Sequence, residues 1–472
     1  MLHSITPKIE ARLRACLPDN RFTAAGPAYL EEPRGRYAGQ AGLLARPRST
    51  EEVATLISAA SEARVPVIPY GGGTGLVGGQ VAPDGPVPLI LSLEKMNAVR
   101  AVYPQENVLI AEAGVILADA QAAALEVDRL FPLSLAAEGS ARLGGVFSTN
   151  AGGTGVLRYG NARDLCLGVE AVMPDGSVLN GLSRLRKNNT GYDLRHLLIG
   201  AEGTLGVITA LSLRLFPRPV ERAVAYLQVS SPAAALTLLS RARDIAGDGV
   251  SAFELMHRQG FDFLAETMPE VDIPWAQVPE WTVMVELGLS RGADAPAALE
   301  RLFEVALSEG LSADGLIAQN ARQADAFWQV RETIPLANRK IGAISSHDIS
   351  VPLGAIAEFI PKATRALGRI DTYRINCFGH VGDGNLHFNV FPVPGKSRAD
   401  HDFQRDAIKR CVHDIVHQMG GSVSAEHGVG RLKVGDLERY ADPTKLAAMR
   451  AIKSALDPHG IMNPGAVLRA NQ

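Results

Sequence analysis

The segment 69–80 is a glycine-rich loop, with glycines at positions 71, 72, 73, 75, 78 and 79. It follows a capping box of Ser49 and Glu52, apolar residues at helical spacing (Val53, Leu56, Ile57 and Ala60), and then an apolar strand pattern (65–68). Glycine lets a pyrophosphate approach backbone N–H groups closely, so the loop is expected to bind a phosphate-containing ligand. It is neither a Walker A loop nor a G-x-G-x-x-G motif that opens a helix, and a flexible surface loop is the alternative.

Three further segments combine glycine with small hydroxyl and amide side chains. They read EGSARLGGVFSTNAGGTGVLRYG (138–160), KNNTGYDL (187–194) and GAEGTLGVI (200–208). A small phosphate ligand needs only one such loop. Several of them, spread over a long part of the chain, predict a long ligand that lies in a groove between two subdomains.

A histidine-containing stretch, NCFGHVGDGNLHFNV (376–390), indicates a second kind of chemistry. Its glycines predict a tight turn that holds His380. Asn385, His387 and Asn389 then alternate with apolar residues, so they should share one face of a strand. The later stretch SAEHGVG (424–430) adds Glu426 and His427.

Two imidazoles and a carboxylate suit a borderline divalent metal such as Zn²⁺ or Mn²⁺. The predicted ligands are His380, His387 and Glu426, and His427 is left as a separate base. The alternative is that these histidines are hydrogen-bonded residues of a glycine-rich turn.

The chain has 472 residues, so two or three domains are expected. Its formal net charge of −3 argues against a nucleic-acid surface. Four cysteines without a C-x-x-C spacing fit a reducing compartment. The N-terminal stretch carries charges throughout, so neither a signal peptide nor a membrane-spanning segment is expected. The prolines of FPRP (216–219) predict a linker, and the helix–strand alternation after it predicts an antiparallel sheet covered by helices.

The four glycine-rich segments resemble the FAD-binding domain of the vanillyl-alcohol oxidase/p-cresol methylhydroxylase flavoproteins. GHVGDGNLH and SAEHGVG resemble one branch, the FAD-linked D-2-hydroxyacid dehydrogenases, which act on D-lactate, glycolate or D-2-hydroxyglutarate. The resemblance runs from about residue 40 to the C-terminus. It implies an α+β fold with a two-subdomain FAD-binding domain (1–218), an α+β substrate-binding cap with an antiparallel sheet (219–425), and a C-terminal segment that returns to the FAD domain (426–472).

The resemblance also implies the residues that contact FAD. The expected contacts are Pro69, Gly71, Gly72, Gly73, Thr74, Gly75, Leu76 and Gly78 in the first loop, Gly139, Ser140, Gly144, Gly145, Ser148, Thr149 and Gly152 in the second, and Glu202, Ile208 and Asn463 farther on. For Asn463, a plain helix stop at Asp457–Pro458 is equally compatible. The first loop has no histidine or cysteine, so the flavin is expected to be non-covalent.

Relatives of this branch clamp the substrate carboxylate with an arginine, which Arg331 matches, on a helical stretch expected to end near Pro335. A solvated helix arginine, paired with Glu332 or a neighbour, is the alternative. Relatives specific for 2-hydroxyglutarate carry a lysine and a threonine where this chain has Ser346 and Pro335. This departure leaves both 2-hydroxyglutarate and a monocarboxylic D-2-hydroxyacid open as substrates.

Other polar residues near this stretch are candidates for substrate contacts. Arg339, Lys340 or His347 are candidates to compensate for the missing lysine. Asn389 is expected to contact the substrate or to orient a ligand. His347 is also the second candidate for the base.

The expected reaction is FAD-dependent, metal-assisted oxidation of a D-2-hydroxyacid to the 2-oxoacid, with His427 accepting the hydroxyl proton. Electrons would pass to an external acceptor, such as an electron-transfer flavoprotein, a quinone or a cytochrome. The expected location is cytoplasmic, or peripheral at the inner face of the membrane, and a homodimer is expected. One alternative is an FAD oxidase of the same fold that acts on a sugar alcohol or lactone with oxygen. The other is a non-enzymatic nucleotide-binding subunit.

Overall fold

The computed structural model describes residues 1–470, which form two compact units. The first unit contains Met1–Gly152, Gly160–Pro217 and the described part of Glu426–Gln472. The second unit contains Gly153–Tyr159 and Arg218–Ala425. The short stretch Gly153–Tyr159 was expected in the FAD-binding domain. It belongs to the second unit, where the Arg158 guanidinium donates hydrogen bonds to Ser251 Oγ and the Gly288 carbonyl.

The first unit combines two larger sheets and one two-stranded sheet with helices. Its helices are α1 (Pro7–Arg14), α2 (Thr50–Ala63), α3 (Leu117–Leu125), α4 (Leu143–Ser148), α6 (Leu194–Leu198), α13 (Val434–Tyr440) and α14 (Pro443–Leu456). One sheet has the order β1 (Phe22–Ala24), β2 (Leu43–Ala45), β4 (Leu89–Ser92), β3 (Val67–Tyr70), in which β2, β4 and β3 are parallel. The other is antiparallel, with the order β5 (Val99–Tyr103), β6 (Val108–Glu112), β10 (Val207–Arg214), β8 (Cys166–Val172), β9 (Val178–Gly181). Two short strands, β7 (Arg129–Leu130) and β11 (Phe216–Pro217), pair with each other.

Helix α2 forms where its apolar spacing predicts it. Val53, Leu56 and Ile57 are fully buried, and the Ser49 hydroxyl accepts a hydrogen bond from the Glu52 N–H. The reciprocal half of the expected capping box is absent. The Glu52 carboxylate accepts instead from the Arg48 N–H and from the guanidinium of Arg21.

The C-terminal segment packs into the core of the first unit. Met462 pairs with Val67 of β3 in parallel fashion, and both side chains are buried in one apolar cluster. Behind this bridge, the Lys453 ammonium donates to the carbonyls of Thr204 and Met462 and to the buried Asp457 carboxylate. These bonds fix the turn that carries Asn463.

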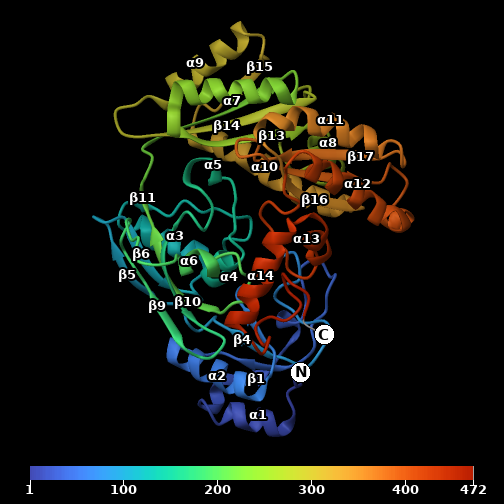
Figure 1. Ribbon diagram of the computed structural model, residues 1–472. Coiled ribbons are helices and arrows are strands. Elements are labelled where there is room, and N and C mark those ends of the chain that lie inside the picture. The colour runs from blue at the N-terminus through green and yellow to red at the C-terminus, as the bar shows by residue number, and fades with distance from the viewer. Residues whose placement is uncertain (471–472) are drawn as a thin grey trace. The chain divides into compact units, whose positions relative to one another are not determined.

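The second unit is built on one antiparallel sheet, as expected. The strand order is β15 (Ser312–Ile317), β12 (Glu221–Val229), β14 (Trp281–Leu289), β13 (Val250–His257), β17 (Arg374–Gly379), β18 (Asn385–Phe391), β16 (Ser345–Ser350). Its helices are α5 (Val156–Tyr159), α7 (Pro232–Ala246), α8 (Arg258–Thr267), α9 (Ala295–Ser308), α10 (Ala321–Ile341), α11 (Ile356–Leu367) and α12 (Arg405–Gln418). Figure 1 shows α7 and α9 beside the strands of this sheet.

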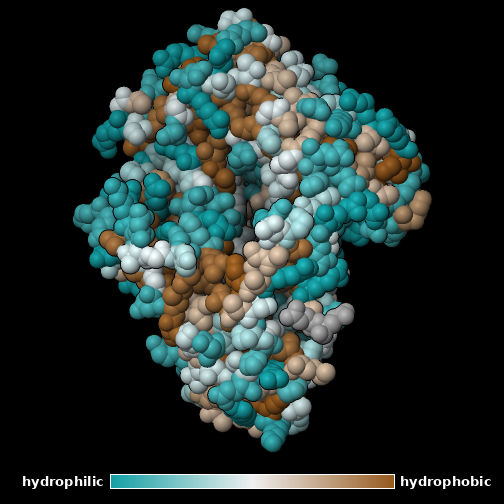
Figure 2. Space-filling model, viewed as in Figure 1, coloured by the Kyte–Doolittle hydropathy of each residue, from teal (hydrophilic) through white to brown (hydrophobic). Residues whose placement is uncertain are grey.

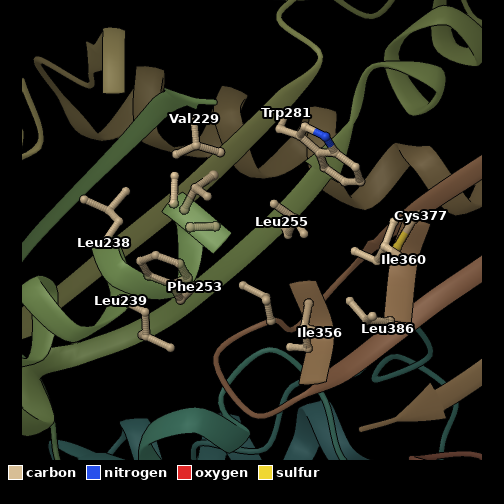
Figure 3. Packing of buried hydrophobic residues seen from close by; sticks show 14 of the residues in the cluster. Val229, Leu238, Leu239, Phe253, Leu255, Trp281, Ile356, Ile360, Cys377 and Leu386 are labelled. Atoms are coloured by element: carbon tan, nitrogen blue, oxygen red, sulfur yellow. The ribbon is translucent and has the colours of Figure 1, made fainter. Parts of the chain in front are cut away.

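Helices cover both faces of this sheet, and each face has its own apolar cluster. On one face, Leu238 and Leu239 of α7 and Ile356 and Ile360 of α11 pack with strand residues such as Leu386 (Figure 3). On the other face, residues of α8 and α10 pack against alternate strand residues such as Met256, Phe378 and Phe391. The strand residues that carry chemistry lie on this second face.

Helix α10 does not end near Pro335, contrary to the expectation from sequence. It runs on to Ile341 with Pro335 inside it. Proline cannot donate a hydrogen bond to the carbonyl four residues earlier, which is that of Arg331. Packing of Val330, Ile334 and Ala337 against the sheet offsets that loss, because all three are buried.

The surface of the described residues is mixed in character. Figure 2 shows mostly hydrophilic residues on the visible face, with hydrophobic ones in scattered patches. Among residues 1–470, none of the helices has the length and apolar character needed to cross a bilayer.

Candidate active site

A pocket in the first unit gathers three of the four glycine-rich segments. Of the expected contacts, those that line it are Pro69, Gly71, Gly72, Gly73, Thr74, Gly75, Leu76, Gly144, Gly145, Ser148, Thr149, Gly152, Glu202 and Ile208. The segment 187–194 does not join them and is solvent-exposed. The pocket therefore forms where loops distant in sequence meet, as expected for a long ligand.

Four expected contacts do not line this pocket: Gly78, Gly139, Ser140 and Asn463. Asn463 instead supports the pocket from behind, because its side-chain amide donates to the carbonyls of Gly79 and Glu202, which do line it. Other lining residues were not expected from sequence, for example Leu135, Ala136 and Ala137, which precede the second glycine-rich segment. These three are ordinary apolar or small residues, and no local pattern marks them. Arg142, Gly203 and Val207 also line the pocket and lie within the glycine-rich segments, where the sequence did give a signal.

The first two glycine-rich segments touch each other through their backbones. A Cβ at Gly71 would lie 3.2 Å from the Gly145 Cα, and a Cβ at Gly72 would overlap the carbonyl oxygen of Ser140. Glycine is required at Gly72 because no flexible side chain is there to move aside. This close approach is what closes one wall of the pocket.

Glu202 fixes the backbone that follows His427. Its carboxylate accepts hydrogen bonds from the N–H groups of Val429 and Gly430, at 2.7 and 2.8 Å. Burial raises the pKa of Glu202 to about 7, although these two N–H donors act in the opposite direction. Glu426 and His427, just before this turn, line the same pocket as the glycine-rich loops. An imidazole is thereby held at the wall of the pocket.

In the second unit, the turn between β17 and β18 brings two histidines together. The rings of His380 and His387 are 5.6 Å apart between centroids, and a nitrogen of one lies within 4.8 Å of a nitrogen of the other. Gly379 and Gly384 both have positive φ in this turn, which favours glycine there. The turn-plus-strand arrangement predicted for the histidines is confirmed.

The polar face of β18 is also as predicted. Leu386, Phe388 and Val390 are fully buried in the cluster on one side, so Asn385, His387 and Asn389 lie on the other. The cross-strand partners on β16 extend this face, with Asp348 opposite His387 and Ser346 opposite Asn389. Asp348 and Asn385 are tied by a side-chain hydrogen bond of 3.1 Å.

His347 does not share this face, which corrects its expected role. Successive side chains of a strand point to opposite sides, so His347 lies on the far side of β16 from Asp348 and Ser346. Its ring packs against that of His413 on α12, at 5.1 Å between centroids. This position does not support a substrate contact or a role as base. Ser346 is exposed on the polar face, where a substrate contact is open to it.

Arg331 of α10 is buried and paired with a carboxylate that sequence reasoning missed. Its side chain contacts Glu254 of β13 through Nε (2.8 Å) and Nη2 (2.7 Å), so it is not the solvated arginine of the alternative reading. The other oxygen of Glu254 lies 2.7 Å from His380 Nδ1. Burial acts to raise the pKa of Glu254, but the charges of His380 and Arg331 outweigh it and hold the pKa at about 2. A sequence signal existed, since Glu254 is the one acidic residue of the strand VSAFELMH.

The chain reaches Glu426 along the edge of the same sheet. Ser422 and Ser350 exchange backbone hydrogen bonds, and the Ala425 N–H donates to the carbonyl of Asp348. Glu426 is the next residue, and it begins the segment that continues into the first unit. Glu426 is thus the residue directly after Ala425, whose N–H bonds to Asp348.

Comparison with known families agrees with this arrangement. A family described as "FAD binding domain" matches residues 41–181, and one described as "FAD linked oxidases, C-terminal domain" matches residues 218–467. The chain belongs to the FAD-linked oxidase family. FAD is accordingly its cofactor, and the resemblance seen in the sequence motifs is confirmed.

Curated relatives of this FAD-linked oxidase cover most of its length. A mitochondrial D-2-hydroxyglutarate dehydrogenase of Arabidopsis thaliana is 36% identical, over 92% of this chain and 76% of the relative. The Bos taurus enzyme of the same name is 38% identical over 96% and 82%, respectively. A D-2-hydroxyglutarate dehydrogenase of Xanthomonas citri is 34% identical over 89% and 88%.

Solved structures of lower identity share the fold. A p-cresol methylhydroxylase with substrate bound has a TM-score of 0.76 at 17% identity, covering 99% of each chain. An alkyldihydroxyacetonephosphate synthase has a TM-score of 0.74 at 17% identity, covering 98% of this chain and 86% of the other. The expected α+β flavoprotein fold is confirmed.

Proposed function

We propose that this protein is an FAD-linked dehydrogenase that oxidises a D-2-hydroxyacid to the 2-oxoacid and passes the electrons to an external acceptor. The observation that carries the proposal is the pocket of the first unit, in which His427 shares a wall with three glycine-rich loops. A base beside a cleft lined by glycine-rich loops suits oxidation of an alcohol by a bound flavin. The three curated relatives described above are named for D-2-hydroxyglutarate, which favours this substrate class over a sugar alcohol or lactone.

The proposed roles of the residues follow from their chemistry. Arg331 binds the substrate carboxylate, with Ser346 and Asn389 on the polar face of the sheet as further contacts. His427 accepts the hydroxyl proton as general base. FAD, when bound, accepts the hydride from the α-carbon. The glycine-rich loops hold its pyrophosphate through backbone N–H groups.

The donor set of the second unit fits a divalent cation, Zn²⁺ or Mn²⁺. One ring nitrogen of His380 lies within 4.8 Å of one of His387, and the Nδ1 of His380 is held by a carboxylate, as metal-binding histidines commonly are. We assign His380, His387 and Glu426 as ligands, the last by its position one residue after Ala425. A bound cation would supply stabilisation of negative charge on the substrate oxygen.

The substrate is tested directly by a panel of D- and L-2-hydroxyacids mixed anaerobically with the purified protein. Bleaching of the flavin absorbance is expected with D-2-hydroxyglutarate or D-lactate and not with their L-enantiomers. No bleaching with any member of the panel, in a sample that contains FAD and metal, would reject the proposal. Bleaching by sugar alcohols or lactones would establish the oxidase alternative. For the remaining partners, the proposal keeps an electron-transfer flavoprotein, quinone or cytochrome as acceptor, a homodimer, and a cytoplasmic or peripheral inner-membrane location.

Gly72→Ala should remove most of the bound FAD, because the new Cβ would overlap the Ser140 carbonyl and force the two loops apart. The measurement is the ratio of flavin absorbance to protein after purification. Gly139→Ala is the matched control, since a Cβ there meets nothing within 4 Å. Equal flavin content in both variants would show that the loop contact is not needed for binding.

The flavin should be held without a covalent bond, because the loop 69–80 contains no histidine or cysteine. The thiol of Cys166, outside that loop, is buried on β8, and burial raises its pKa to about 12, which disfavours the reactive thiolate. Acid precipitation should therefore release the yellow colour into the supernatant. Colour that stays in the pellet would contradict this expectation.

Ser346→Lys should shift substrate preference toward dicarboxylic hydroxyacids. Ser346 is exposed on the face that carries His387 and Asn389, so a lysine there would place a positive charge beside the substrate. The measurement is the ratio of kcat/KM for D-2-hydroxyglutarate to kcat/KM for D-lactate. This ratio should rise by about tenfold or more, because the lysine adds one ion pair with the second carboxylate of the substrate. His347→Lys, on the opposite face, should not raise this ratio. An unchanged ratio for Ser346→Lys would mean that the side chain does not reach the substrate.

A further inference from the structure

Glu254 is a buried carboxylate that no step of the proposed reaction uses. Only 1% of its side chain is exposed, and each of its two oxygens contacts a residue that has a role in the proposed function. One oxygen contacts Nε and Nη2 of Arg331 at 2.8 and 2.7 Å, and the other lies 2.7 Å from His380 Nδ1. The geometry points to Glu254 as a positioning residue that fixes the substrate clamp and a metal ligand through one carboxylate.

The contacts around Glu254 close into a ring of side chains. The Arg331 guanidinium lies 5.1 Å from the centroid of the Phe378 ring, and that ring lies 5.0 Å from the ring of His387. His387 in turn packs at 5.6 Å against His380, which returns to Glu254. Each of the five side chains therefore lies beside two others of the ring.

This arrangement sets which atoms are left for ligands. A carboxylate at His380 Nδ1 accepts a hydrogen bond from that nitrogen, which leaves Nε2 as the nitrogen that binds a cation. The two contacts of Arg331 use Nε and Nη2, and Nη1 makes no hydrogen bond within residues 1–470. Glu254 thereby presents Nη1 to the substrate carboxylate and Nε2 to the metal.

A glutamine at position 254 cannot do both tasks. Its amide has one acceptor oxygen, while its NH₂ group can only donate. Whichever way the amide turns, a donor faces either the guanidinium or the imidazole N–H. The volume and shape of the side chain stay the same, so Glu254→Gln separates the positioning role from simple packing.

The chain offers a matched control in Glu286. It lies on β14 of the same sheet, and its Oε2 accepts from Arg222 Nε (2.8 Å) and from Trp328 Nε1 of α10 (2.7 Å). Glu286 thus pairs with an arginine and with the same helix α10, but it contacts neither Arg331 nor a histidine. Glu286→Gln should therefore show only the effect of weakening an ion pair between a glutamate and an arginine in this sheet.

The first measurement does not depend on activity. Metal-free protein with FAD retained is titrated with Zn²⁺, and the heat of binding gives the affinity. Glu254→Gln should weaken binding by about 10–100-fold, and Glu286→Gln should leave it unchanged. The second measurement is flavin reduction by the best D-2-hydroxyacid, where Glu254→Gln should raise KM by about tenfold or more while FAD content stays normal.

Equal Zn²⁺ affinity in Glu254→Gln and the control would overturn the proposal, as would an affected affinity with an unaffected KM. If Glu254→Gln does not fold, the double variant Glu254→Gln/Arg331→Met removes both buried charges, and an unweakened Zn²⁺ affinity there would also overturn it. The inference rests on the proposed function, but the two fail differently. Absence of flavin reduction in the wild type would reject the proposed function. The Zn²⁺ titration would still show whether Glu254 affects metal binding by His380.

Discussion

His427→Ala should slow flavin reduction by a D-2-hydroxyacid about 10²–10⁴-fold, the usual cost of losing a general base. His427 lines the pocket formed by the glycine-rich loops, and the turn after it is fixed by Glu202. The variant should keep FAD, metal and substrate binding. Anaerobic stopped-flow measurement of flavin bleaching gives the rate, and absorbance and elemental analysis give the two contents.

The pH profile adds a second readout of His427. In the wild type, protonation of the imidazole at low pH removes the base, so the rate should fall on the acidic side. In His427→Ala that acidic limb should disappear. The control is His347→Asn, which should keep the wild-type rate because His347 lies on the opposite face of β16, against His413. If His427→Ala loses the metal and regains a normal rate when metal is added back, His427 is a ligand and Glu426 must be reconsidered as the base.

Removal of the divalent metal should abolish flavin reduction while FAD stays bound. A Lewis acid contributes several kcal/mol to stabilising negative charge on the substrate oxygen, so a loss on the order of 10²-fold or more is expected. Dialysis against a chelator, followed by the anaerobic substrate mix, measures the rate. Added Zn²⁺ or Mn²⁺ should restore it.

The ligand assignment is checked with single variants. His380→Ala, His387→Ala and Glu426→Ala should each lower the metal content found by elemental analysis. His413→Ala is the control, because that histidine lies on α12, on the other side of the sheet from His387. Full activity of a sample shown to be free of metal would mean that His380 and His387 are hydrogen-bonded histidines of the turn and not metal ligands.

The sequence by itself determined the parts that depend on local patterns. The helical spacing of Val53, Leu56 and Ile57, and the alternation of Asn385, His387 and Asn389 with apolar residues, each report which side of an element is buried. The glycine-rich motifs were enough to identify the family, because only a few residue types fit where two backbone segments lie close together. Most of the residues expected to contact FAD line the pocket, because they belong to these motifs.

Only the tertiary structure decided which distant residues share one partner. Glu254 contacts Arg331 and His380, which are far from it in sequence, so the sequence of its strand does not predict these two partners. Packing of β16 against α12 also decided that the side of the strand with His347 meets His413, away from the polar face, and helix packing carried α10 through Pro335. Asn463 was read as a ligand contact, but its amide binds backbone carbonyls behind the pocket. In each case a long-range contact, formed only when the sheet assembles, outweighs the preference of the local sequence.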